Sequence, residues 1–78
     1  MASATETRLI ELCARRFKLD PALLLPGGDV FDSLGVDSMQ ILELLSELEG
    51  EFDVEIPDYE LRAVKTFAEL ARVIERRL

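Results

Sequence analysis

Apolar residues recur at helical spacing through most of this 78-residue chain, and this periodicity limits the possible folds more than any other feature. Between residues 37 and 52, the residues that follow the i, i+3/i+4 rule are Ile41, Leu44, Leu45, Leu48 and Phe52. No segment sustains the alternation of apolar and polar residues that marks a strand, and residues 53–56 are the only short candidate. The pattern therefore predicts an all-α fold.

Capping residues mark where the first two helices begin. A helix over about residues 3–17 starts with Ser3 and Glu6 at capping-box spacing, and its apolar face is expected to pack on the second helix. The second helix should begin at Asp37. Its carboxylate can accept a hydrogen bond from a free backbone NH and meets the positive end of the helix dipole.

Two more helices are expected in the last third of the chain. A short one fits within residues 58–63, after Pro57, and the last begins at Thr66, whose spacing to Glu69 is again that of a capping box. The residues expected on its buried face are Phe67, Leu70, Ala71, Ile74 and Leu78. The sequence thus predicts a small four-helix bundle with three longer helices, a short third helix and a long first loop.

That first loop, residues 18–36, is rich in residues that break helices, namely Pro21, Pro26, Gly27, Gly28 and Gly35. A helical turn around residues 21–24 is compatible with this composition. A loop of this length needs apolar anchors, and the candidates are Leu23, Leu24, Phe31, Leu34 and Val36.

The length supports one domain, residues 1–78, with one modest core. No apolar run approaches the roughly 20 residues that span a bilayer, and the start lacks the basic and apolar parts of a secretory signal. We therefore expect a cytoplasmic protein that does not insert into membranes, with a monomer as the default state. The single cysteine, Cys13, can form neither an internal disulfide nor a metal cage.

Charge is concentrated in the middle of the chain. Residues 29–60 carry eleven acidic and no basic side chains, whereas residues 1–28 and 61–78 have net charges of +1 and +3. Such a negative field opposes binding to nucleic acids and favours encounters with basic patches on proteins. The alternative is a surface that only keeps the protein soluble. The complete absence of Lys and Arg from this segment argues against that alternative.

Ser38 follows Asp37 in the first turn of the second expected helix, next to a loop that contains glycine. A serine hydrolase needs a base beside its nucleophile, and the chain has no histidine. Asp37 is occupied as a helix cap in this interpretation. We therefore expect no enzymatic activity, and the dipeptide taken alone is compatible with a plain helix start.

Residues 31–57 resemble acyl carrier proteins. The resemblance rests on Leu34-Gly-Val-Asp-Ser-Met and, after an acidic amphipathic helix, on Glu51-Phe-Asp-Val-Glu-Ile-Pro, while the flanking helices match the family's four-helix plan. It implies that a phosphopantetheinyl transferase attaches 4′-phosphopantetheine from coenzyme A to Ser38, with Asp37 as part of the motif. The thiol of this arm would carry acyl groups as thioesters, so the reactive chemistry would belong to the cofactor and to partner enzymes.

The resemblance also implies a surface for partners. Met39 and Leu42 lie one helical turn apart beside Ser38, and the family adds Ile56 to this apolar rim. Basic patches on partner enzymes would recognise acids of the second helix, at least Glu43 and Glu49. Ordinary partial burial and a solvated acidic face are the alternatives. No calcium-loop spacing is present, so no metal site is assigned, although a weak cation site is conceivable among Glu49, Glu51, Asp53 and Glu55.

Three departures leave the type of carrier open. Met39 stands where leucine is usual, Gln40 where carriers of fatty-acid synthesis often have an acid, and Ser46 where an apolar residue is frequent. Asp-Ser-Met also occurs in D-alanyl and other aminoacyl carriers. The candidates are a carrier of fatty-acid, polyketide or related biosynthesis, with acyl-loading enzymes and synthases as partners, and an aminoacyl or D-alanyl carrier loaded by an adenylating ligase. An unmodified acidic adaptor is the remote alternative.

Overall fold

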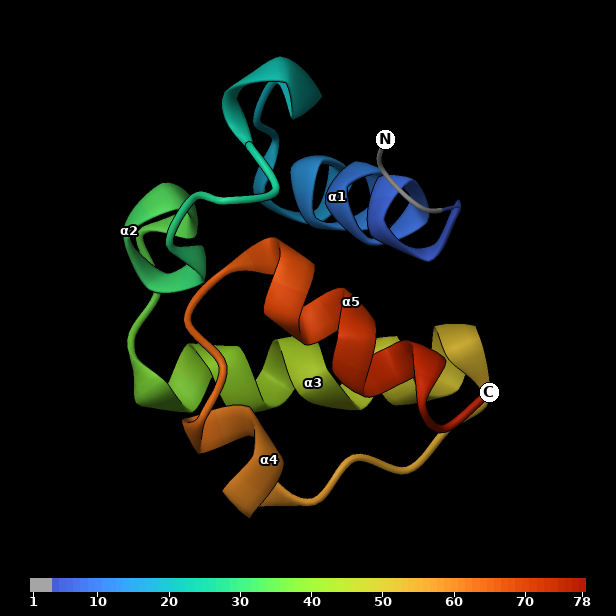
Figure 1. Cartoon of the computed structure of the whole chain (residues 1–78). Coiled ribbons are helices and arrows are strands. Elements are labelled where there is room, and N and C mark those ends of the chain that lie inside the picture. Colours follow the sequence, from blue (N-terminus) through green and yellow to red (C-terminus); the bar gives the residue numbers. More distant parts are fainter. Residues whose placement is uncertain (1–3) are drawn as a thin grey trace.

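The structure, a computed structural model, describes residues 4–78, and within this range its regular elements are all helices, with no strand among them (Figure 1). Its elements are α1 (Ala4–Phe17), the 3₁₀ turn η1 (Pro21–Leu23), α2 (Val30–Leu34), α3 (Ser38–Phe52), α4 (Asp58–Arg62) and α5 (Phe67–Glu75). The predicted all-α fold is confirmed, as are the positions of the three longer helices and of the short helix after Pro57. The predicted cap at Ser3 lies outside the described residues.

Both helix starts predicted at Asp37 and Thr66 are confirmed, and both form complete capping boxes. Asp37 Oδ1 accepts from the Gln40 backbone NH (2.9 Å), while Gln40 Oε1 accepts from the Asp37 backbone NH (3.1 Å). Thr66 and Glu69 exchange the same pair of bonds at 3.2 and 3.1 Å. Hydrogen bonds from backbone NH groups lower the pKa of Glu69, because they stabilise its ionised form.

The first connection holds a helix that the periodicity did not predict. α2 has five residues, starts where Asp29 Oδ1 accepts from the Asp32 backbone NH (2.9 Å), and ends at Gly35 in the left-handed region (φ 66°). An aspartate at the start and a glycine after the end were the available signals. The helical turn expected around residues 21–24 is confirmed as η1.

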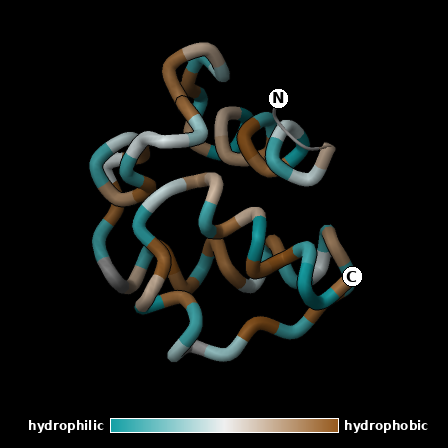
Figure 2. The backbone as a smooth tube through the Cα atoms, in the orientation of Figure 1, coloured by the Kyte–Doolittle hydropathy of each residue, from teal (hydrophilic) through white to brown (hydrophobic). Residues whose placement is uncertain are grey.

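The buried faces of α3 and α5 largely match the predictions. All five residues expected on the α3 face are buried, and so are Phe67, Leu70, Ala71 and Ile74 of α5. Figure 2 shows hydrophobic and hydrophilic residues alternating along the helices, as expected for elements that cover one core. The prediction for Leu78 is wrong. Its side chain is exposed because α5 ends at Glu75, three residues earlier.

The packing of α1 differs from the expectation. Its most extensive backbone contact is with α5, and the two helices lie side by side (Figure 1), whereas the sequence predicted packing on the helix that starts near Ser38. Leu9, Leu12 and Cys13 of α1 are buried in the shared core. Since amphipathic periodicity identifies a buried face but not its neighbour, the sequence could not decide between α3 and α5.

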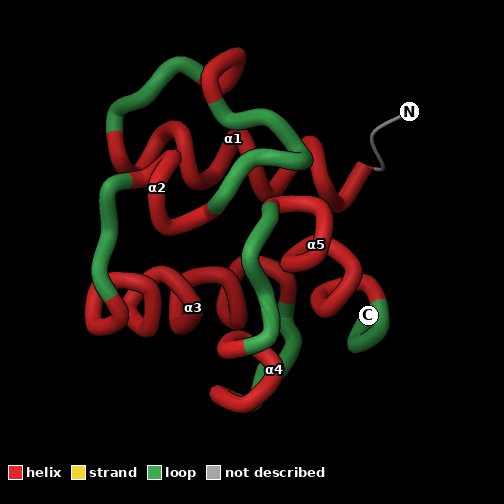
Figure 3. The backbone as a smooth tube through the Cα atoms, turned by 60° about the vertical axis from the view of Figure 1, so that its left-hand side comes forward, coloured by secondary structure: helices red, strands yellow, loops and turns green. Residues whose placement is uncertain are grey.

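Backbone hydrogen bonds hold the long first connection against the rest of the molecule. The Val30 backbone NH donates to the Lys65 carbonyl (2.8 Å), and the Ala68 backbone NH donates to the Pro26 carbonyl (2.9 Å). Leu24, Leu34 and Val36 are buried as predicted, Phe31 is half-buried, and the prediction for Leu23 is wrong because it is exposed in η1. Figure 3 shows α2 between two stretches of loop that lead from α1 to α3.

Candidate functional site

Ser38 is the first residue of α3. The chain reaches it from α2 through Gly35, whose left-handed backbone ends α2, and through Val36, which is buried. Asp37 then closes the capping box with Gln40. The backbone of Ser38 is therefore held on both sides at one end of α3. The sequence predicts that its hydroxyl points into solvent. That prediction concerns a side chain that lies outside the described part of the structure.

The start of α3 suits an anionic group electrostatically. The free backbone NH groups of a helix N-terminus and the helix dipole both favour negative charge there. The first turn of α3 contains no acidic residue, because the capping box closes with the neutral Gln40. The N-cap carboxylate of Asp37 opposes a phosphate at this end.

Two exposed apolar side chains lie next to Ser38 on α3. Met39 is 76% exposed and Leu42 is 43% exposed, and neither is among the buried core residues. Their position is that expected for an apolar rim, and their contact with partners stays a prediction.

Ile56, the third residue predicted for that rim, is only 4% exposed and thus more deeply buried than Met39 and Leu42. Its contact with partners stays a prediction. Its side chain is part of the hydrophobic core, and its backbone NH donates to Glu49 Oε2 (3.0 Å). Ile56 is a core residue.

The same hydrogen bond gives the carboxylate of Glu49 a structural role. Its carboxylate is half-buried and satisfies a backbone NH seven residues further on. A charged acceptor makes this a stronger tie than an ordinary hydrogen bond. Glu49 was predicted as a recognition acid, and that role remains a prediction.

The other acids of α3, Glu43, Glu47 and Glu51, meet arginines from α1. Arg16 Nη1 lies 2.6 Å from Glu47 Oε1, and its Nη2 lies 3.8 Å from Glu43 Oε2. At the other end, Arg8 Nη2 donates to both the carboxylate (3.3 Å) and the backbone carbonyl (3.1 Å) of Glu51. A count of charge by segment does not reveal these pairs. Arginines eight residues apart on α1, opposite acids four residues apart on α3, were the available signal.

Cys13 offers no chemistry. It is fully buried, and burial, with a smaller contribution from the charge of Glu47, raises the pKa of its thiol to about 12. At neutral pH the group is therefore a protonated core thiol rather than a nucleophile. Among the side chains that the structure describes, no three His, Cys, Asp or Glu residues are grouped in a way that could hold a metal ion. None of the described helices is both long and apolar enough to cross a membrane.

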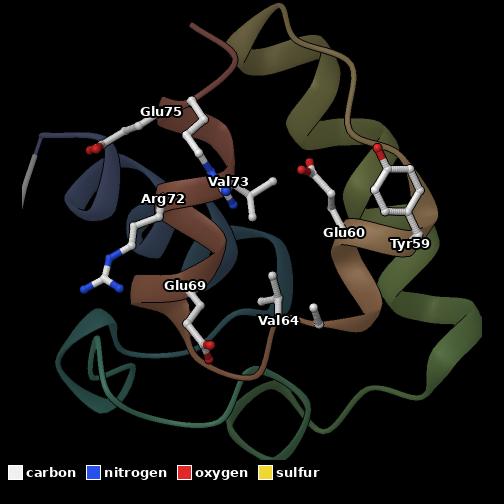
Figure 4. A pocket seen from close by; sticks show the side chains of 9 residues that line it. Tyr59, Glu60, Val64, Glu69, Arg72, Val73 and Glu75 are labelled. Atoms are coloured by element: carbon white, nitrogen blue, oxygen red, sulfur yellow. The ribbon is translucent and has the colours of Figure 1, made fainter.

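A groove of about 750 Å³ lies between α4 and α5 (Figure 4). Ala63, Val64 and Val73 form its apolar part, and Figure 4 shows the Glu60 side chain pointing into the space between the two helices. Glu60, which lines this groove, accepts a hydrogen bond at Oε2 from Arg77 Nε (2.9 Å). None of the residues predicted for cofactor or partner binding lines it, so the groove is not part of the Ser38 site.

Comparisons with known proteins show which family this chain resembles. The family model described as "Phosphopantetheine attachment site" matches residues 7–74. The acyl carrier protein of Syntrophobacter fumaroxidans is 32% identical over 68 residues, which cover 87% of this chain and 84% of the relative. The acyl carrier protein of Bdellovibrio bacteriovorus is 31% identical over 74 residues, 95% of each chain.

The helical fold and the attachment domain together define a carrier of covalently bound 4′-phosphopantetheine. The chain belongs to the acyl carrier protein family. The resemblance found in residues 31–57 is thereby confirmed over nearly the whole chain.

Proposed function

We propose that Ser38 carries the 4′-phosphopantetheine arm and that the chain presents thioester-bound acyl intermediates to enzymes of fatty-acid, polyketide or related biosynthesis. The observation that carries this proposal is the position of Ser38 at the N-terminus of a 15-residue helix, within the span matched by the attachment-site family. A phosphodiester there gains from the helix dipole.

The other described serines fit the role less well. Ser46 lies in the middle of α3, and its hydroxyl donates to the Leu42 carbonyl (3.4 Å). Ser33 is half-buried within α2. Neither is the first residue of a long helix, so neither offers the same electrostatic support for a phosphate.

The proposed division of labour leaves catalysis to partners. With no histidine in the chain, a phosphopantetheinyl transferase must supply the base that activates the Ser38 hydroxyl. Loading enzymes and synthases would then dock on Met39, Leu42 and Glu43, with their basic patches facing the acids of α3. In this proposal the chain is not an enzyme. It acts as one carrier domain, residues 1–78, in the cytoplasm, as a monomer and without binding nucleic acid.

An aminoacyl or D-alanyl carrier, loaded by an adenylating ligase, is the second candidate. Two residues favour it. Met39 completes the Asp-Ser-Met sequence that also occurs in aminoacyl carriers. Gln40 leaves the first turn of α3 without the acid that carriers of fatty-acid synthesis often have there. Incubation of the modified protein with acyl-loading enzymes and with amino-acid ligases separates the two candidates. The thioester that forms, identified by its mass, shows which type of cargo is accepted.

The test of the proposal is the intact mass of the protein before and after incubation with coenzyme A and a promiscuous phosphopantetheinyl transferase. Wild type and Ser46→Ala, a matched control on the same helix, should gain one phosphopantetheine, whereas Ser38→Ala should gain none. If Ser38→Ala is modified, or if well-folded wild type is not, the assignment to Ser38 is wrong. In the second case the unmodified adaptor becomes the better interpretation.

A further inference from the structure

Three acids spaced four residues apart, Glu43, Glu47 and Glu51, form one face of α3 and approach arginines of α1. The pairing changes along the helix. Arg8 is held by two hydrogen bonds to Glu51 and lies 4.7 Å from the centre of the Phe52 ring, whereas Arg16 divides its guanidinium between Glu47 and Glu43. Arg16 is the arginine nearer the Ser38 end.

Glu43 is the least engaged of these acids. Its side chain is 71% exposed, and the nearest guanidinium nitrogen is 3.8 Å away, compared with 2.6 Å at Glu47. A basic partner that approaches the start of α3 therefore meets the Glu43 carboxylate, which already lies close to the positive charge of Arg16. Arg16 lowers the attraction that Glu43 and Glu47 can offer.

We propose that Arg16 limits the acidic surface available on α3 and thereby sets how strongly this carrier binds partner enzymes through Lys and Arg side chains. The inference rests on the proposed docking along α3. Charge complementarity favours a basic partner, since residues 29–60 contain eleven acids and no basic residue. Arg16 competes with the partner's cations for the same two carboxylates.

The size of the effect follows from the nature of the pair. Exposed ion pairs stabilise by at most about 1 kcal/mol, which corresponds to a factor of about five in binding. A partner can therefore displace Arg16, but with reduced affinity. Removing the guanidinium should strengthen docking about two- to fivefold.

The experiment compares Arg16→Gln with Arg15→Gln. Arg15 is the adjacent residue on α1, is exposed, and makes no ion pair with any residue the structure describes, so both variants change net charge equally. The readout is kcat and KM for phosphopantetheine transfer by a transferase whose carrier-binding surface is basic. Arg16→Gln should lower KM about two- to fivefold with kcat unchanged and make KM depend more steeply on salt. Arg15→Gln should change KM by less.

A second background tests the mechanism. With Glu43→Gln and Glu47→Gln in place, Arg16→Gln should have no more effect than Arg15→Gln, because no carboxylate remains to be released. Equal effects of the two arginine variants in the unmodified background, or a higher KM for Arg16→Gln, would overturn the inference.

Folding is checked by circular dichroism. If Arg16→Gln does not fold, Arg16→Lys decides by the same criterion, since its single ammonium group cannot span both carboxylates. It should lower KM by a smaller factor than the range given for Arg16→Gln, and an unchanged KM counts against the inference. The outcomes also separate the two proposals. If no variant and no wild-type protein is modified at Ser38, the proposed function fails, whereas modification of every variant with the same KM refutes only the role of Arg16.

Discussion

The two ends of α3 are built for different purposes. At its start, Met39 and Leu42 are exposed, and the local structure is held by the capping box of Asp37 and Gln40. At its end, the carboxylate of Glu49 binds the Ile56 backbone NH, and Arg8 binds Glu51. One helix thus has an end with exposed apolar side chains and an end that is hydrogen-bonded to other parts of the fold. The comparison teaches that exposure near Ser38 is compatible with stability because anchoring is concentrated elsewhere.

Replacement of Leu48 should give the largest effect on stability. Leu48 is 1% exposed on the buried face of α3, so Leu48→Ala should lower the free energy of unfolding by about 2–5 kcal/mol. Leu42→Ala, the matched control on the exposed face, should cost less than about 1 kcal/mol. Urea unfolding followed by circular dichroism measures both. Similar losses would mean that Leu42 belongs to the core and that the two faces of α3 do not differ as described.

Glu49 and Glu43 should show opposite behaviour. Glu49→Ala removes a charged acceptor from the Ile56 backbone NH and should lower the free energy of unfolding by about 1–3 kcal/mol. Glu43→Ala should leave stability within about 0.5 kcal/mol, since its side chain is mostly exposed, but should raise KM for the transferase. Thermal melts and transfer kinetics on both variants test this contrast. A stable Glu49→Ala with impaired docking would restore Glu49 as a recognition acid.

Loss of the cap at the start of α3 should have a smaller effect. Asp37→Ala removes the acceptor for the Gln40 backbone NH and should cost about 0.5–2 kcal/mol, whereas Asp37→Asn keeps an acceptor and should cost less. Both can be measured by thermal unfolding, with phosphopantetheine transfer recorded in parallel. If both variants lose the same amount of stability relative to wild type, the charge of Asp37, rather than its hydrogen bond, matters at this end.

Local signals allowed much of the fold and the site to be predicted. The starts of α3 and α5 depend on side chains that bind backbone NH groups three residues away, so Asp37 and Thr66 could be identified directly. The five buried residues of α3 follow from its periodicity. α2 was missed because a helix of five residues is too short to show a period, although Asp29 and Gly35 bracket it.

The sequence by itself determined that the chain is helical, where its main helices begin, and that Ser38 stands in a carrier-family motif, because these features depend on neighbours within a few residues. Only the tertiary structure decided that α1 lies along α5, that Ile56 is buried, and that Arg16 reaches Glu43 and Glu47. These features depend on residues far apart in the chain, whose distances are set by how the helices pack. The acidic surface of α3 is therefore a property of two helices, and its strength could not be read from the charges of one.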